Sequence, residues 1–229
     1  MSLDTHIYLT EEIKQSDLIV LAARPGVGRI SFVLTLAANA ATKFQCETTF
    51  FCLDKIGTQD VHRWFSRNTQ ATGISVYIKN QASLSVSEIA SRIQRLKSKK
   101  KLNLLIINHL NIIKTNQNEK SKTPSSSILQ ELKTLAKKIQ IPIIVLVLLH
   151  NRANDFDYVE PQLSDLRDLG VSEHDADAIW FLERKFISTC KAEDYHSATL
   201  TITRNGDILK KLSLIFSRDN MTFCKRESE

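Results

Sequence analysis

The chain has 229 residues, of which 42% are hydrophobic and 24% charged, so it can bury one substantial core and has the length of a single α/β domain. We expect one domain over residues 1–229. The net charge of +6 permits contact with nucleic acid, although an ordinary Lys-rich surface gives the same balance. No segment approaches the roughly 18 apolar residues of a membrane span, and residues 1–7 lack the features of a signal peptide. We therefore expect a cytoplasmic protein without a membrane partner.

Short apolar runs rich in β-branched residues alternate with segments of helical periodicity along most of the chain. This alternation is typical of a mainly parallel sheet covered by helices. The predicted strands are residues 18–22, 48–53, 74–78, 102–107, 141–148 and 178–182. The predicted helices are residues 31–43, 58–68, 86–98 and 126–139. The sequence thus predicts an α/β fold.

Two short patterns predict local structure. Ser85, followed three residues later by Glu88, forms a capping box and predicts a helix start at residue 86. The turn signal Asn205-Gly-Asp207 separates residues 198–204 from residues 208–216 and predicts a β-hairpin. The hairpin would place an antiparallel pair of strands at one edge of the sheet.

The cysteines and histidines do not have the spacing of a metal site, and we expect no metal ligands among them. Cys52 lies within an apolar run and is expected in the core. Reduced thiols are expected for the four cysteines, Cys46, Cys52, Cys190 and Cys224. Three histidines, His109, His150 and His174, adjoin a core strand or an acidic turn and are interpreted as surface or supporting residues.

Residues 17–32 run from an apolar strand through a glycine-bearing turn into an apolar helix, as a phosphate-binding loop does. A complete P-loop also has a Lys that reaches the phosphates and a Ser or Thr hydroxyl that binds Mg²⁺. Here Arg29 stands at the Lys position and Ile30 at the hydroxyl position. Arg keeps the positive charge in a bulkier group, whereas Ile offers no oxygen to a hard cation. The candidate nucleotide-binding residues are Arg24, Pro25, Gly26, Val27, Gly28, Arg29, Ile30 and Ser31.

The order of motifs along residues 11–218 resembles the C-terminal motor domain of DnaB-type replicative helicases. The resemblance rests on the phrase Ala22-Ala-Arg-Pro25, on Asp54, and on residues 104–108, 141–148, 164–170 and 173–179. It implies a RecA-like P-loop NTPase fold, with a mainly parallel central sheet flanked by helices and a C-terminal antiparallel hairpin. It also implies ATP as the ligand and DNA replication as the process.

The resemblance assigns catalytic roles that several residues here do not match. Asn108 takes the place of the family's Asp beside the metal, and the catalytic Glu corresponds to Asp54. The Gln that senses the γ-phosphate falls on Leu148. Because phosphoryl transfer depends on positioning and electrostatics, these changes together predict that hydrolysis is lost or very slow. We expect ATP to bind weakly or without hydrolysis, and we expect no bound Mg²⁺.

Other residues resemble parts of the helicase that contact a neighbour or DNA. Arg204 resembles the arginine finger that reaches the next subunit's nucleotide, with a simple charge at a hairpin tip as the alternative. Backbone amides and cationic side chains suit a sequence-independent track for single-stranded DNA, although an exposed capped helix would show similar residues. The candidate DNA-binding residues are Arg167, Asp168 and Gly170, with Lys114, Lys120 and Lys122 from a preceding polar loop.

Three functions are compatible with this sequence. The favoured one is a DnaB-like motor domain with impaired or lost ATP hydrolysis that binds single-stranded DNA, replicative helicase subunits or other replication proteins. The second is an active ATP-dependent helicase with an atypical P-loop, and the third is an interaction protein that kept only the fold. The chain begins almost at its first strand without an N-terminal helicase domain, so a homohexamer is expected to be hard to assemble and the oligomeric state stays open.

Overall fold

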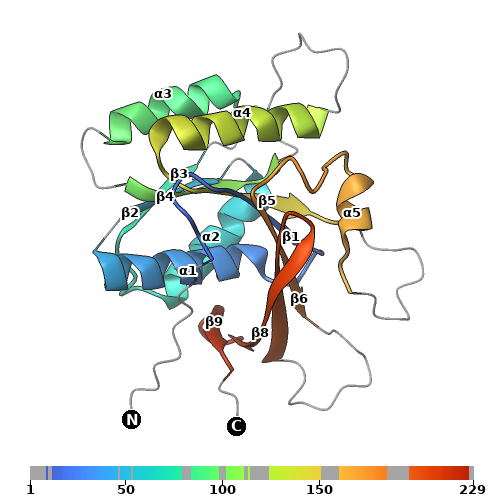
Figure 1. Ribbon diagram of the computed structural model, residues 1–229. Helices are drawn as coiled ribbons and strands as arrows, with labels where there is room; N and C mark the ends of the chain where they lie inside the picture. The colour runs from blue at the N-terminus through green and yellow to red at the C-terminus, as the bar shows by residue number, and fades with distance from the viewer. Residues whose placement is uncertain are drawn as a thin grey trace.

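The computed structural model describes residues 9, 12–45, 47–52, 54–78, 84–97, 102–110, 113, 124–150, 160–184 and 196–226. It is an α/β fold in which helices lie on both faces of one sheet (Figure 1). Among these residues no helix is both long enough and apolar enough to span a bilayer.

The sheet has nine strands in the order β3-β2-β4-β5-β1-β6-β7-β8-β9. Its parallel part consists of β1 (Leu18–Ala23), β2 (Glu47–Cys52), β3 (Ile74–Ile78), β4 (Leu102–Asn108), β5 (Ile143–Leu148) and β6 (Ala178–Arg184). The antiparallel part consists of β7 (Ser197–Arg204), β8 (Asp207–Ser217) and β9 (Thr222–Lys225). Because β1 lies between β5 and β6, the carboxyl ends of all three meet where the first loop begins.

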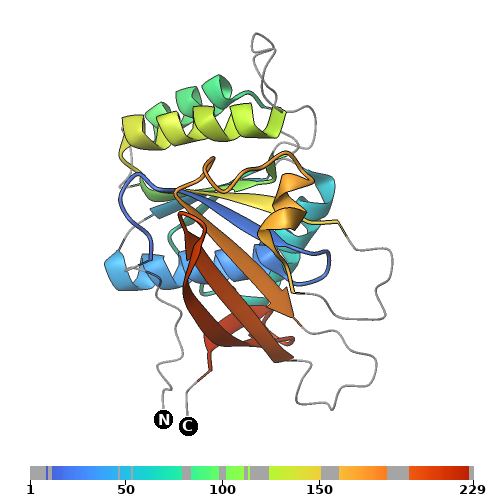
Figure 2. The ribbon, with the colours of Figure 1, turned by 45° about the vertical axis from the view of Figure 1, so that its right-hand side comes forward.

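The sheet divides the hydrophobic core into two layers, and helices cover each of them (Figures 1 and 2). Helices α3 (Val86–Lys97) and α4 (Pro124–Ile139) cover one face, where alternate residues of β1 such as Leu18 and Val20 are buried. Helices α1 (Arg29–Phe44) and α2 (Lys55–Arg67) cover the other face, together with the curled C-terminal strands. The alternation of β1 side chains between the layers explains why its sequence is apolar at every position. A short helix, α5 (Leu163–Arg167), lies beyond the end of β5.

The predicted strands and helices are present, and the differences lie at their ends. The capping box is confirmed, because the Glu88 N–H donates to Ser85 Oγ at 3.3 Å and the Ser85 N–H donates to Glu88 Oε2 at 2.8 Å. The strand predicted from residue 141 begins at Ile143 instead. Gln140 ends α4 in the left-handed region (φ 56°), and the Ile141 N–H still donates to Ala136 O at 3.3 Å. Residue 141 therefore completes the helix end rather than starting the strand.

The hairpin turn is also confirmed, because Asn205 and Gly206 both have positive φ (55° and 87°). A type I′ turn requires this at its two central residues, and its twist matches the right-handed twist of the flanking strands. The antiparallel part is larger than predicted, because β9 adds a third strand that sequence reasoning did not find. Strand β9 is only four residues long, pairs with the neighbouring β8 and packs onto α1, which is remote in sequence.

Candidate functional site

The loop between β1 and α1 has the backbone shape of a P-loop. Gly28 is the residue before α1 and takes a left-handed conformation (φ 97°) that L side chains rarely adopt. A Cβ on Gly28 would also lie 3.4 Å from the ring of Phe223, on β9. The first turn of α1 contains no acidic residue, so its free N–H groups favour an anion.

Arg24, one of the predicted nucleotide-binding residues, contacts protein groups on either side of the loop. Its Nη1 donates to the carbonyl oxygen of His150 at 2.6 Å, just beyond the end of β5. Its Nη2 lies 3.6 Å from Oδ2 of Asp165, a buried carboxylate of α5. Arg24 therefore connects the start of the loop to α5, which carries part of the predicted DNA-binding segment.

The two substituted positions of the P-loop have different environments. Ile30 is buried at 4% exposure and belongs to the hydrophobic cluster under α1. Arg29 Nε is buried without a hydrogen-bond partner among the described residues. Burial lowers the pKa of Arg29, while the nearby carboxylates of Asp54 and Asp60 oppose that shift. Ile30 thus forms part of the core, whereas Arg29 is a cation held near two carboxylates.

Asp54 and Asn108 meet at the carboxyl ends of β2 and β4 and are bonded to each other. The Asn108 amide nitrogen donates to Asp54 Oδ2 at 2.7 Å. Asp54 is also the N-cap of α2, since its Oδ1 accepts from the Gly57 N–H. One carboxylate oxygen therefore caps the start of α2, and the other accepts a hydrogen bond from the Asn108 amide. The sequence carried a signal for this cap, an Asp three residues before Gly57, that the predicted helix start at residue 58 missed.

Magnesium fits these residues poorly, because the hydroxyl and the second carboxylate that would bind a hard cation are replaced by Ile30 and the neutral Asn108. Ile30 has no oxygen, and the Asp54 carboxylate is already occupied by Gly57 and Asn108. Asn108 is fully buried, and its Oδ1 has no hydrogen-bond partner among the described residues, which leaves one neutral oxygen. The described part of the chain contains no group of three or more His, Cys, Asp and Glu residues that could hold a metal.

A cavity of about 320 Å³ opens beside the P-loop, and arginines from four segments line it. They are Arg29 of α1, Arg63 of α2, Arg184 at the end of β6 and Arg218 after β8, with Asp60 the one carboxylate among the described lining residues. Gly26 and Gly28 bring the loop backbone to the same cavity. We call this cavity the arginine pocket.

Sequence reasoning missed three of the four arginines of this pocket. Arg184 could have been found, because it follows an apolar run at the carboxyl edge of the sheet, where ligands bind in α/β folds. Arg63 and Arg218 had no such signal. Arg218 is brought to the pocket by the turn between β8 and β9, which was not predicted.

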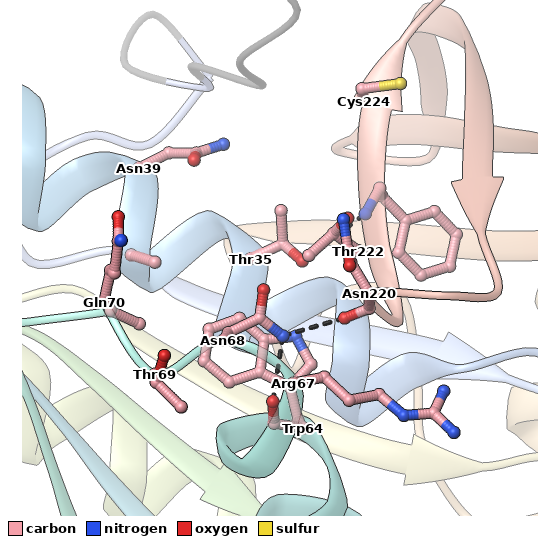
Figure 3. Close-up of a pocket in the computed structure, with 13 residues that line it drawn as sticks. Thr35, Asn39, Trp64, Arg67, Asn68, Thr69, Gln70, Asn220, Thr222 and Cys224 are labelled. Carbon is pink, nitrogen blue, oxygen red and sulfur yellow. Dashed lines mark hydrogen bonds between the residues drawn. The ribbon is translucent and has the colours of Figure 1, made fainter.

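A second cavity, of about 490 Å³, lies between α1, the end of α2 and β9 (Figure 3). Arg67 is the one charged side chain among the described residues that line it. Asn68 Nδ2 donates to the carbonyl oxygens of Trp64 at 2.9 Å and Asn220 at 2.8 Å, drawn as dashed lines in Figure 3. Arg67 Nη1 donates to Arg218 O at 2.8 Å. These bonds tie the end of α2 to the β8–β9 turn and so position Arg218.

Two further predicted residues lie at opposite edges of the sheet, Leu148 at the carboxyl end of β5 and Arg204 beside the start of β1. Leu148 is the last residue of β5 and is in register with Ala23, the last residue of β1. Arg204 lies away from the arginine pocket, with its Nη2 at 2.6 Å from Asp17 Oδ2 and at 3.3 Å from Glu12 O of the same chain. This pairing with Asp17, chiefly a hydrogen bond, raises the pKa of Arg204.

The predicted DNA-binding residues are described only in part. Arg167 is exposed and pairs with Glu173, with Nη2 and Oε1 2.6 Å apart. Asp168 is the C-cap of α5, and Gly170 follows at positive φ (71°). Lys114, Lys120 and Lys122 lie outside the described residues. The structure therefore shows an accessible cation at Arg167, but one that already faces a carboxylate.

The parallel sheet, the glycine loop and the strand-end residues together define a RecA-like P-loop domain. The chain belongs to the family of the DnaB-like helicase C terminal domain, whose model matches residues 2–73 and 55–225. It is 29% identical over 248 residues to the Replicative DNA helicase DnaC of Bacillus subtilis, covering 96% of this chain and 54% of the relative. The Replicative DNA helicase DnaB of Buchnera aphidicola subsp. Acyrthosiphon pisum is 30% identical, with 87% of this chain and 50% of the relative covered.

Solved structures show the same fold. One, the structure of an ATPase domain, superposes with a TM-score of 0.75 and 23% identity, covering 93% of this chain and 86% of that one. A DnaB-Like Replicative Helicase, solved in a study of its interactions with primase, gives a TM-score of 0.74 at 21% identity, covering 93% of this chain and 60% of that one. This chain spans about half the length of the curated relatives that it matches.

Proposed function

We propose that this protein acts in DNA replication as a DnaB-type motor-domain-like protein with impaired or lost ATP hydrolysis. It works by binding single-stranded DNA or subunits of a replicative helicase. Membership of the DnaB-like family supports the link to replication. The observation that carries the loss of hydrolysis is the bond between Asn108 and Asp54.

That bond matters because it helps to hold the expected catalytic carboxylate in place. Asp54 caps α2 with one oxygen and accepts from the Asn108 amide with the other. An attacking water would have to be oriented by the remaining lone pairs of a carboxylate that these two donors already fix. Neither Ile30 nor Leu148 can compensate, because neither side chain binds a metal or a phosphate oxygen. The remaining cations of the site can hold an anion but cannot activate water.

Arg167, Asp168 and Gly170 are the described candidates for DNA contact. DNA phosphate would compete with Glu173 for the Arg167 guanidinium, so binding should be weak and should fall steeply with salt. The Arg24–Asp165 ion pair connects this segment to the P-loop, and it would carry any coupling between DNA and nucleotide. Arg204 is proposed to stabilise its own subunit through Asp17, and to act on a neighbour only if that pair opens.

The test is binding to labelled single-stranded DNA and to a purified replicative helicase, together with ATP turnover in the presence of the DNA. We expect binding to one of these partners at low salt and no turnover above background. Turnover that is abolished by Arg29→Ala would instead establish the active helicase. Absence of binding to DNA and helicase would leave an interaction protein that kept only the fold.

A further inference from the structure

The arginine pocket gathers positive charge without the ligands that a metal would need. Four guanidinium groups and one carboxylate line it. A divalent cation is repelled by such a lining, and the ligands that would offset the repulsion are missing, because Ile30 has no oxygen and Asn108 has only a neutral one. An anion with several charges is the ligand that this lining stabilises.

Arg184 is a buried cation whose charge an anion in the pocket would stabilise. It is 6% exposed, its Cζ lies 4.0 Å from the centroid of the Phe216 ring, and its Nη1 donates to Val27 O at 3.4 Å. Burial, and then the charge of Arg218, lower the pKa of Arg184 to about 10, so it stays charged at neutral pH. Cations that are buried beside like charges occur preferentially at functional sites.

Arg29 brings a further guanidinium to the same cavity at the first residue of α1. Its Nε is buried and has no hydrogen-bond partner in the described part of the chain. Its charge is balanced in part by Asp54 and Asp60. A guanidinium therefore lies close to Asp54, the carboxylate at the position of the family's catalytic Glu.

From this arrangement we infer that the pocket binds the polyphosphate chain of a nucleoside triphosphate in its metal-free form, with arginines supplying the charge that Mg²⁺ supplies at a complete P-loop. The inference rests on the proposed function for the presence of a nucleotide, and it adds the ionic form of the ligand. Because Mg²⁺ neutralises two charges of the polyphosphate and competes with the guanidiniums, magnesium weakens binding. Free tripolyphosphate shares the same chemistry.

Titration calorimetry on the full chain tests this inference, with ATP, AMP and tripolyphosphate each measured in EDTA and in excess Mg²⁺. We expect ATP to bind in EDTA, several-fold more weakly in Mg²⁺, and AMP to bind least. Tripolyphosphate that matches ATP would show that the pocket reads the phosphates alone and would overturn the assignment to a nucleotide. Binding of ATP that requires Mg²⁺, or no binding in either buffer at low salt, would overturn the inference as a whole.

Arginine variants test whether ATP binds in the arginine pocket. Arg29→Met, and the exposed pair Arg63→Met with Arg218→Met, should each weaken ATP binding in EDTA by about tenfold or more, as expected for lost charge-assisted hydrogen bonds. Arg95→Met removes a guanidinium from α3, on the opposite face of the sheet, and should leave the affinity unchanged. Equal affinities of the pocket variants and Arg95→Met would overturn the inference. The exposed pair keeps the test valid if Arg29→Met fails to fold.

The same preparations separate this inference from the proposed function. Binding to single-stranded DNA and to helicase subunits is measured without nucleotide, so it can succeed when ATP binding fails. Conversely, metal-independent ATP binding without any contact to DNA or helicase would support the pocket and contradict the proposed function.

Discussion

The arginine pocket and the neighbouring ends of β2 and β4 handle charge in opposite ways. On the phosphate side, formed by Gly28, Arg29, Arg184 and Arg218, cations face a cavity. On the carboxylate side, formed by Asp54, Gly57 and Asn108, the polar groups are bonded to one another. The loop backbone and the positive charge are present, whereas the residues at the positions of the catalytic carboxylate and the metal-side Asp bond to each other and to the start of α2. Anion binding and the orientation of water would therefore depend on different strand ends.

The largest expected effect is that of Asn108→Asp, which makes the carboxylate side resemble a metal site. The change replaces a 2.7 Å hydrogen bond by two facing carboxylates at a fully buried position. The free energy of unfolding should fall by about 2–4 kcal/mol in EDTA, because a buried charge loses its compensation. Chemical denaturation measures this loss.

Asn103→Asp, at an exposed position on the same strand, is the control and should change stability little. Millimolar Mg²⁺ should recover part of the loss in Asn108→Asp by bridging the two carboxylates, with no effect on the control. An Asn108→Asp protein as stable as the control would mean that the bond to Asp54 does not hold this side together.

A smaller effect is expected from Gly57→Ala, which tests how tightly the carboxylate side is packed. The new Cβ would lie well inside van der Waals contact of the Asn108 amide nitrogen and 2.8 Å from Asp54 Oδ2. Overpacking of this kind costs about 1–3 kcal/mol of stability. Thermal unfolding, with Gln59→Ala at an exposed position of α2 as the control, measures it. A Gly57→Ala protein that unfolds at the control's temperature would contradict the packing described here.

Arg204→Met removes a cation that is paired with a carboxylate and does not line the arginine pocket. The variant leaves Asp17, 9% exposed, without its partner, so the free energy of unfolding should fall by about 1–2 kcal/mol. Nucleotide affinity of the isolated subunit should not change. Asp17→Asn with intact Arg204 should lose a similar amount of stability. A fall in ATP affinity for Arg204→Met would place this residue with the pocket arginines after all.

The smallest effect is a pH dependence that originates at His109. Burial lowers its pKa below the ordinary value of 6.5, with a charge contribution from Arg29 in the same direction and one from Asp54 opposing both. Below pH 6.5 the unfolded chain therefore binds a proton before the folded chain does, and stability falls as the pH is lowered through this range. Stability curves of the protein and of His109→Gln should converge above that pH and separate below it. Parallel curves throughout would show that His109 titrates alike in both states.

Much of the fold could be predicted, because it depends on local sequence patterns. The β1 strand is apolar on both faces, the capping box at Ser85 is a local hydrogen-bond pattern, and the Asn205-Gly206 turn needs only its own two residues. Strand β9 was not predicted and helix α5 was only an alternative, because four or five residues carry no usable period.

The glycine loop can be read from the chain alone, as can the substitutions at Arg29, Ile30, Asn108 and Leu148 and the resemblance to a helicase family. The contacts that these residues make cannot. The folded structure shows that Asp54 bonds to Asn108, that Arg204 pairs with Asp17, and that Arg184 and Arg218 join Arg29 around one cavity. The physical reason is that hydrogen bonds and charge interactions act over a few ångströms, and parallel strands bring together residues that are tens to hundreds of positions apart in the chain.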